Sequence, residues 1–184
     1  FSWRSDITAG LVARDYKSED DWRARSVANP EMLDPRDIIQ LTLDPDPDTW
    51  ICIAQRVFSS QTRRFRDWKD LKTHELIVPA WMTAEKGITQ KGKESFHTLE
   101  NTGERMFIVV DLDVPPEAQH TTILWNLATI REPSLVLKTR GKGLHGWFPV
   151  GADDERFWDY ALILGADVHI KNNLSNFVRL PNGI

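Results

Sequence analysis

Two aspartates, two positions apart at the end of an apolar segment, are the residues best suited to do chemistry. Residues 107–113 read Phe-Ile-Val-Val-Asp-Leu-Asp, a β-branched run that predicts a buried strand. Side chains alternate faces along a strand, so we expect Asp111 and Asp113 to share one face. Paired carboxylates repel unless a cation neutralises them, and hard oxygen ligands suit Mg²⁺ or Mn²⁺. A solvated turn or a helix cap is the alternative, because Pro115-Pro116 follow directly.

A second candidate lies in residues 135–148, where the turn Arg140-Gly141-Lys142-Gly143 separates two predicted strands. A glycine-containing hairpin turn can aim backbone N–H groups at an anion without obstruction by side chains. Lys142 adds positive charge, Gly143 leaves the backbone accessible, and His145 follows the turn. We therefore expect a phosphate-binding hairpin, with an ordinary turn and a half-buried histidine as the alternative.

The third candidate comes near the C-terminus. Asp167 follows a predicted helix and would supply a third carboxylate for a two-metal site, while Arg179 would meet a phosphate. An aspartate after a helix is also a common turn residue, so both interpretations stay open.

Positive charge gathers in one further place. The chain has a net charge of −4, which argues against a protein that coats nucleic acid non-specifically. Arg63, Arg64 and Arg66 form a dense local cluster that would contact a phosphate backbone. A solvated surface is the alternative.

Composition limits the remaining classes. With Cys52 as its single cysteine, the chain can form no internal disulfide and no cysteine-rich zinc site, and a cytoplasmic setting is expected. No apolar run approaches the roughly 18–20 residues that span a bilayer, so no membrane partner is expected.

The pattern of elements predicts an α+β protein. In the first part we expect a helix over 36–43 capped by Asp34, strands over 50–58 and 75–83 joined by a basic helical connection, and a loop or hairpin over 85–104. After it we expect a strand at 106–113, a helix at 116–131, strands at 134–138 and 144–150, a helix at 153–165 and a strand at 177–180. This β-α-β-β-α-β order predicts an antiparallel sheet backed by two helices, as in RNA-recognition-motif-like (RRM-like) and palm folds. We therefore divide the chain into an N-terminal αβ lobe, 1–104, and a catalytic lobe, 105–184.

Three motifs in this order resemble the archaeo-eukaryotic primase superfamily, over about residues 105–184. Val110-Asp111-Leu112-Asp113 resembles its first motif, an apolar strand ending in Asp-x-Asp. Gly143-Leu144-His145 resembles its second, a small residue, one spacer and a histidine. The third is a carboxylate after a helix, and the stretch 179–183 is similar to an Arg-Leu-Pro-Gly-like segment of plasmid- and phage-type primase-polymerases. The family usually has serine where this chain has Gly143, and an asparagine precedes the final glycine here.

The resemblance implies a DNA primase, a DNA polymerase or both. Asp111, Asp113 and Asp167 would hold two Mg²⁺ or Mn²⁺ ions. His145, Lys142, Gly143 and Arg179 would bind the incoming nucleoside triphosphate. The implied partners are a single-stranded DNA template, a primer and nucleoside triphosphates. Because the chain begins without methionine, we expect a module of a larger protein that carries a helicase or another replication domain.

Three rival functions follow from the same residues. A metal-dependent glycosyltransferase would use Asp-x-Asp, but residues 1–105 show no glycine-rich nucleotide-binding turn. A replication-initiator nuclease would need a second histidine beside His145, with Tyr160 as its tyrosine. A non-catalytic nucleic-acid-binding domain is the third.

Overall fold

The computed structural model describes residues 9–11, 13–25, 33–113, 117–139, 143–167, 171 and 174–181. The chain divides into two compact units. The first comprises Phe1–Asn29 and Ile108–Asn172, and the second comprises Pro30–Phe107 and Asn173–Ile184. Helices and antiparallel strands occur together, which confirms the predicted α+β class. Each unit joins distant stretches of sequence, and this differs from the predicted division at residue 104.

A three-stranded sheet forms the centre of the first unit, within its described residues. The strands are β6 (Phe107–Leu112), β7 (Leu135–Lys138) and β8 (Leu144–Pro149), and β8 lies between the other two. β7 and β8 run antiparallel, with Leu137 opposite His145. The connection from β6 to β7 runs through α4 (Glu117–Ala128) and passes the intervening β8. All three strands and α4 agree with the sequence prediction.

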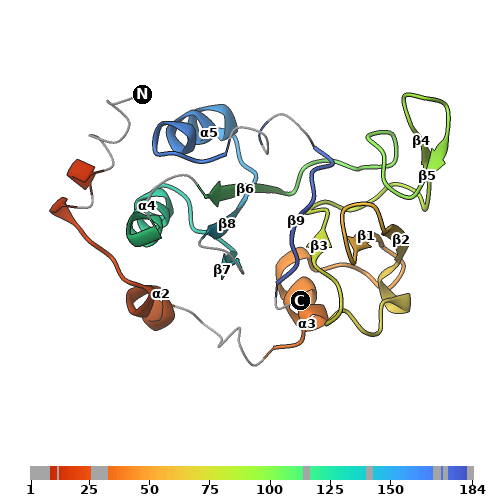
Figure 1. The fold of residues 1–184 in the computed structure, drawn as a ribbon, viewed down its shortest axis with the longest axis horizontal. Coiled ribbons are helices and arrows are strands. Elements are labelled where there is room, and N and C mark those ends of the chain that lie inside the picture. The colour runs from red at the N-terminus through yellow and green to blue at the C-terminus, as the bar shows by residue number, and fades with distance from the viewer. Residues whose placement is uncertain are drawn as a thin grey trace. The chain divides into compact units, whose positions relative to one another are not determined.

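Two helices, α4 and α5 (Asp154–Ile163), lie beside this sheet (Figure 1). Alternate strand residues pack with them in one buried cluster, whose members include Ile108, Val110, Leu112, Leu124, Leu127, Phe148, Phe157 and Ala161. Gly146 on β8 faces the same cluster, because a Cβ atom there would lie 2.8 Å from Cδ2 of Leu124. The residues between these positions therefore face away from the helices. That second face carries the candidate site.

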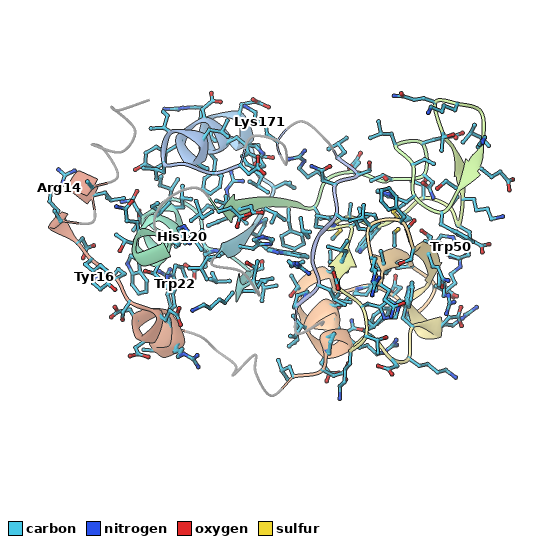
Figure 2. All side chains as sticks on the ribbon, in the orientation of Figure 1. Arg14, Tyr16, Trp22, Trp50, His120 and Lys171 are labelled. Carbon is cyan, nitrogen blue, oxygen red and sulfur yellow. The ribbon has the colours of Figure 1, made fainter. Side chains whose placement is uncertain are left out.

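The N-terminal segment packs against α4 in the first unit. The backbone N–H of Lys17 donates to the hydroxyl of Thr122 at 2.8 Å. Trp22 on α2 (Glu19–Arg25), labelled in Figure 2, donates from Nε1 to the carbonyl of Thr121 at 3.0 Å. Its ring meets that of Trp125 edge-on, with 5.1 Å between the ring centroids. These contacts assign residues 13–25 to the same unit as the carboxylates and not to an N-terminal lobe.

The second unit contains a four-stranded sheet in its described part. Its strand order is β2-β1-β3-β9, with β1 at Trp50–Ala54, β2 at Ser60–Arg64, β3 at Leu76–Ile77 and β9 at Val178–Arg179. Helix α3 (Pro35–Leu43) precedes it, and the side chain of Asp34 caps this helix by accepting from the backbone N–H of Arg36 at 3.0 Å. The predicted helix and its cap are therefore confirmed.

The predicted helical connection after β1 is wrong. Ser60–Arg64 form β2, which is followed by the short 3₁₀ helix η2 (Phe65–Asp67). In β2, buried Thr62 lies between exposed Gln61 and Arg63 and pairs with Cys52 of β1. This period of two is that of a strand with one buried face, although the arginines suggested a solvated helix.

The last predicted strand also differs from expectation, because β9 does not complete the sheet of β6. It pairs antiparallel with β3, with Leu76 opposite Arg179, and the backbone N–H of Leu180 donates to the carbonyl of Glu75 at 2.8 Å. In the first unit, the backbone N–H of Asp167 donates to the carbonyl of Asp111 on β6. The turn after α5 therefore donates to a backbone carbonyl of β6 that a fourth strand was expected to bind.

The loop or hairpin predicted over 85–104 contains a short antiparallel pair, β4 (Gly87–Ile88) and β5 (Glu94–Ser95). Among the residues that the structure describes, no helix has the length and apolar character needed to cross a membrane.

Candidate active site

Asp111 and Asp113 lie on the face of the first unit's sheet that points away from α4 and α5. Ile108, Val110 and Leu112 of β6 are buried in the cluster with the helices, so the alternate residues project to the opposite face. The two carboxyl groups are close enough for a side-chain hydrogen bond between them. The structure thus places both aspartates together, as their spacing predicts.

Asp167 reaches the same place through a turn after α5. Gly165 has a φ of 107°, a conformation that side chains rarely adopt, and it reverses the chain at the end of the helix. The backbone N–H of Asp167 then donates to the carbonyl of Asp111 at 2.9 Å. Its negative charge acts on Asp113 and contributes to raising the pKa of that residue. The backbone of Asp167 therefore lies against the end of β6, close enough for its charge to act on Asp113.

His145 faces Asp111 from the neighbouring strand. It lies on β8 between Leu144 and Gly146, which face the helices, so its ring projects to the opposite face of the sheet, where it is buried. Its Nε2 atom is 3.1 Å from Oδ2 of Asp111, and both side chains are largely buried. The pair is ionic when the imidazole is protonated. His145 and Asp111 therefore form a contacting pair of side chains.

Gly143 approaches Asp113 more closely than any other residue type would allow without a shift. A Cβ atom at position 143 would lie 2.2 Å from Oδ1 of Asp113 and 3.1 Å from the hydroxyl oxygen of Thr139. The Thr139 backbone N–H donates to the Gly143 carbonyl at 3.0 Å, which closes the base of the β7–β8 hairpin. The sequence analysis missed Thr139. Its position at the end of β7, just before a glycine-rich turn, was the available signal.

Asp113 titrates above its ordinary range. Partial shielding of the carboxyl from water raises its pKa most, and the negative charge of Asp111 raises it further. His145 opposes the shift, while the hydrogen bond with Asp111 and the charge of Asp167 add to it. The site therefore accumulates more negative charge than the surrounding protein neutralises.

This electrostatic repulsion predicts a pH-dependent stability. The folded-state pKa of Asp113 is raised, so ionising it costs free energy, and the cost appears as the pH rises above about 4. Asp113→Asn should therefore have a higher melting temperature than the unmodified chain at about pH 7, measured without divalent cations. At about pH 3 the carboxyl is protonated in both folded and unfolded states, and that advantage should disappear. A difference in melting temperature that does not change with pH would contradict this assignment.

The donor atoms fit a hard divalent cation. Oδ1 of Asp111 and Nδ1 of His145 are buried and have no hydrogen-bond partner in the described part of the chain. A buried polar atom left without a partner costs about 1–3 kcal/mol and calls for a functional explanation. Within the described residues, no three histidine, cysteine, aspartate or glutamate side chains already converge as a group that could hold a metal ion.

The remaining predicted site residues belong to the second unit or fall outside the described residues. Lys142 is outside the described residues. Arg179 belongs to the second unit, where its Nη1 atom is 3.3 Å from Oε2 of Glu75. Arg63, Arg64 and Arg66 also belong to the second unit, on β2 and η2. The proposed contacts of these residues with phosphates stay predictions.

Tyr160, the candidate tyrosine of an initiator nuclease, lies on α5. Its hydroxyl donates to Oδ1 of Asn126 on α4 at 2.6 Å. The hydroxyl links the two helices, which cover the face of the sheet opposite to Asp111 and His145. This arrangement gives the tyrosine a structural role.

Comparison of the chain with protein-family models, with curated proteins and with solved structures gave no match. The functional argument therefore depends on the geometry of the site and on the sequence motifs.

Proposed function

We propose that this chain catalyses metal-dependent, template-directed nucleotidyl transfer, as a DNA primase, a DNA polymerase or both. The single observation that carries the proposal is the pairing of Asp111 with Asp113 at one end of β6, with the backbone of Asp167 hydrogen-bonded to that of Asp111 and with His145 in contact with Asp111. Phosphoryl and nucleotidyl transfer need concentrated negative charge to hold cations against a triphosphate.

The fold supports the same proposal. In the described sheet β8 lies between β6 and β7, which is the strand order expected for the core of an RRM-like palm. The carboxylates of β6 lie on the face away from α4 and α5, and the exposed Asp113 can be reached from solvent without displacing either helix. The resemblance of the three motifs to the archaeo-eukaryotic primase superfamily agrees with this arrangement.

The roles of the residues follow from their places. A divalent cation bound by Asp111 and Asp113, together with Asp167, would lower the pKa of a primer 3′-hydroxyl and neutralise the charge of the triphosphate. His145 is directed by its contact with Asp111 and would donate a charge-assisted hydrogen bond to a phosphate oxygen. Gly143 keeps the hairpin backbone close to Asp113, so an N–H group there would serve in place of a side-chain hydroxyl.

A primer-extension assay tests the proposal. The protein is incubated with a single-stranded DNA template, labelled nucleotides and Mg²⁺ or Mn²⁺, with and without a primer. We expect labelled products whose sequence follows the template and which disappear when the metal is chelated. Products in the primer-free reaction would define a primase, and products only with a primer would define a polymerase. No incorporation under either condition would contradict the proposal.

Replacing Gly143 by alanine should lower nucleotide incorporation by about 100-fold, the loss that a misplacement of about 1 Å at a reacting group can cause. The added Cβ would lie 2.2 Å from Oδ1 of Asp113, so the carboxylate must move. The moving group is the end of an exposed side chain, so the melting temperature should change little. Gly10→Ala is the control, because a Cβ there meets nothing within 4 Å. Full activity of Gly143→Ala would show that the position of Asp113 is not critical.

A further inference from the structure

The tip of the β1–β2 hairpin presents an aromatic ring to solvent. Residues 55–59 connect the two strands, and within them Phe58 is 100% exposed and Val57 is 60% exposed. No other large apolar side chain in the described residues is as exposed as Phe58. An aromatic ring in this position needs an explanation other than packing of the core.

The tip is held in a defined conformation. The backbone N–H of Ser59 donates to the carbonyl of Arg56 at 2.9 Å, and the backbone N–H of Arg56 donates to the hydroxyl of Ser59 at 2.8 Å. Below the tip, the two strands pair over five positions, from Trp50 opposite Arg64 to Ala54 opposite Ser60. Phe58 is therefore displayed by a rigid hairpin.

Positive charge flanks the exposed ring. Arg56 at the tip and Arg63 on β2 are exposed, and neither makes an ion pair within the described part of the chain. The guanidinium of Arg63 lies over the ring of Trp68, 5.0 Å from its centroid, which limits the number of conformations it can adopt. Arg56 shares the tip with Phe58, and Arg63 lies further down the hairpin, opposite Ile51. In a chain of net charge −4, two arginines without an ion pair on one hairpin with an exposed aromatic ring are a local complement to a polyanion.

Arg64 and Arg66 differ from these two because the structure shows partners for them. Arg64 lies over the ring of Trp50, 3.9 Å from its centroid, and donates to the backbone carbonyl of Asp48. Arg66 pairs with the carboxylate of Asp48. These contacts support the loop before β1, so Arg56 and Arg63 are the better candidates for an external anion.

The size of the patch distinguishes between kinds of partner. A specific protein partner covers about 800 Å² on each side with an apolar centre, and Val57 and Phe58 alone are too small for that. Single-stranded nucleic acid can be bound by a smaller apolar surface than a protein partner. Its recognition combines a basic surface that follows the backbone with isolated aromatic side chains on which bases stack.

We propose that the β1–β2 hairpin is a contact site for single-stranded nucleic acid, in which Phe58 stacks on a base while Arg56 and Arg63 contact flanking phosphates. β2 is at the edge of its sheet, so a nucleic-acid strand can approach it without displacing another β-strand. This inference depends on the proposed function for the class of partner. It concerns binding alone, which is measured separately from catalysis.

The test is fluorescence anisotropy with a fluorescein-labelled oligothymidylate of about 20 nucleotides, longer than the roughly 4–16 nucleotides that one binding fold covers. Chelator is present, so that no nucleotide is incorporated. Phe58→Ala should bind the oligonucleotide about 5- to 100-fold more weakly than the unmodified chain, as expected for the loss of one stacked base. Phe58→Tyr should restore binding, and Phe58→Leu should behave like Phe58→Ala.

Charge and stacking are separated by the salt dependence. Arg63→Gln should reduce the slope of log affinity against log salt by about 0.7, the value for one phosphate contact on a single strand, while Phe58→Ala should leave the slope unchanged. Leu41→Ala, at a 70% exposed residue on α3, is the matched control and should bind normally.

Normal binding by Phe58→Ala would overturn the proposal, as would normal binding by Phe58→Leu, because a simple apolar contact needs no ring. If the unmodified chain binds through Phe58 but extends no primer, the proposed function fails while this inference stands.

Discussion

Replacing Asp111 and Asp113 together by asparagine is expected to lower nucleotide incorporation by about 10³-fold or more. The two carboxylates supply the negative charge that would hold a divalent cation, and a bound cation stabilises the transition state of nucleotidyl transfer by several kcal/mol. The two carboxyl groups are in hydrogen-bond reach of each other, and their repulsion contributes to raising the pKa of Asp113. Removing that repulsion should leave the fold intact. Incorporation is measured by primer extension, and folding by circular dichroism and thermal unfolding.

The control for this double variant removes two carboxylates elsewhere. Asp20 on α2 and Asp37 on α3 are exposed and lie outside the candidate site. The Asp20→Asn/Asp37→Asn variant has the same change in net charge and should incorporate nucleotides normally. Undiminished synthesis by Asp111→Asn/Asp113→Asn would refute the proposed role of the pair.

The second large effect is expected at His145. His145→Ala should weaken the binding of a nucleoside triphosphate by roughly 10- to 150-fold, which corresponds to the 1.5–3 kcal/mol of a hydrogen bond to a charged group. The imidazole is buried, its Nε2 atom is 3.1 Å from Asp111, and its Nδ1 atom has no partner in the described residues. Calorimetric titration with a deoxynucleoside triphosphate and Mn²⁺ measures the loss.

Measuring template binding shows whether His145 acts on the nucleoside triphosphate alone or on nucleic acid as well. His145→Ala should bind the labelled oligonucleotide as tightly as the unmodified chain, because the proposed strand contacts lie in the other unit. His145→Gln keeps a hydrogen-bond donor and should recover part of the nucleotide affinity. A collapse of template binding with normal nucleotide affinity would assign His145 to a different site.

Local patterns in the sequence were sufficient for most elements of the first unit. β6, α4, β7, β8 and α5 were each predicted within a few residues, because apolar residues mark each of them and turn residues separate them. The alternation along β6 also predicted that Asp111 and Asp113 share one face, and the buried cluster shows that this is the face away from the helices. A period of two decides this locally, without reference to distant contacts.

The assembly of strands into sheets was not predictable in the same way. β9 contains only Val178 and Arg179, too few residues to show which sheet they would join, and their partners on β3 are about a hundred positions away. β2 was assigned to a helix because its arginines obscured the alternation around Thr62. Short strands depend on non-local pairing, which a single sequence does not reveal.

For the candidate site, the sequence predicted which residues take part but not the contacts between them. Asp167 was chosen by spacing after a helix, and the structure adds the reason for its position, a glycine turn and a hydrogen bond to the carbonyl of Asp111. Nothing in the sequence indicated that Gly143 touches Asp113 or that Thr139 closes the hairpin beside them. Both contacts depend on the register of β7 against β8 and on its distance from β6.

The most direct test of the central claim locates the bound cation itself. Fe²⁺ is substituted for Mg²⁺, and ascorbate with peroxide then generates hydroxyl radicals that cut the backbone close to the metal. Mass spectrometry of the fragments identifies the cut positions without any need for catalysis. We predict cuts near Asp111, Asp113 and Asp167 that are lost in Asp111→Asn/Asp113→Asn. Cuts elsewhere in the chain, or cuts that persist in that variant, would contradict a cation site at these carboxylates.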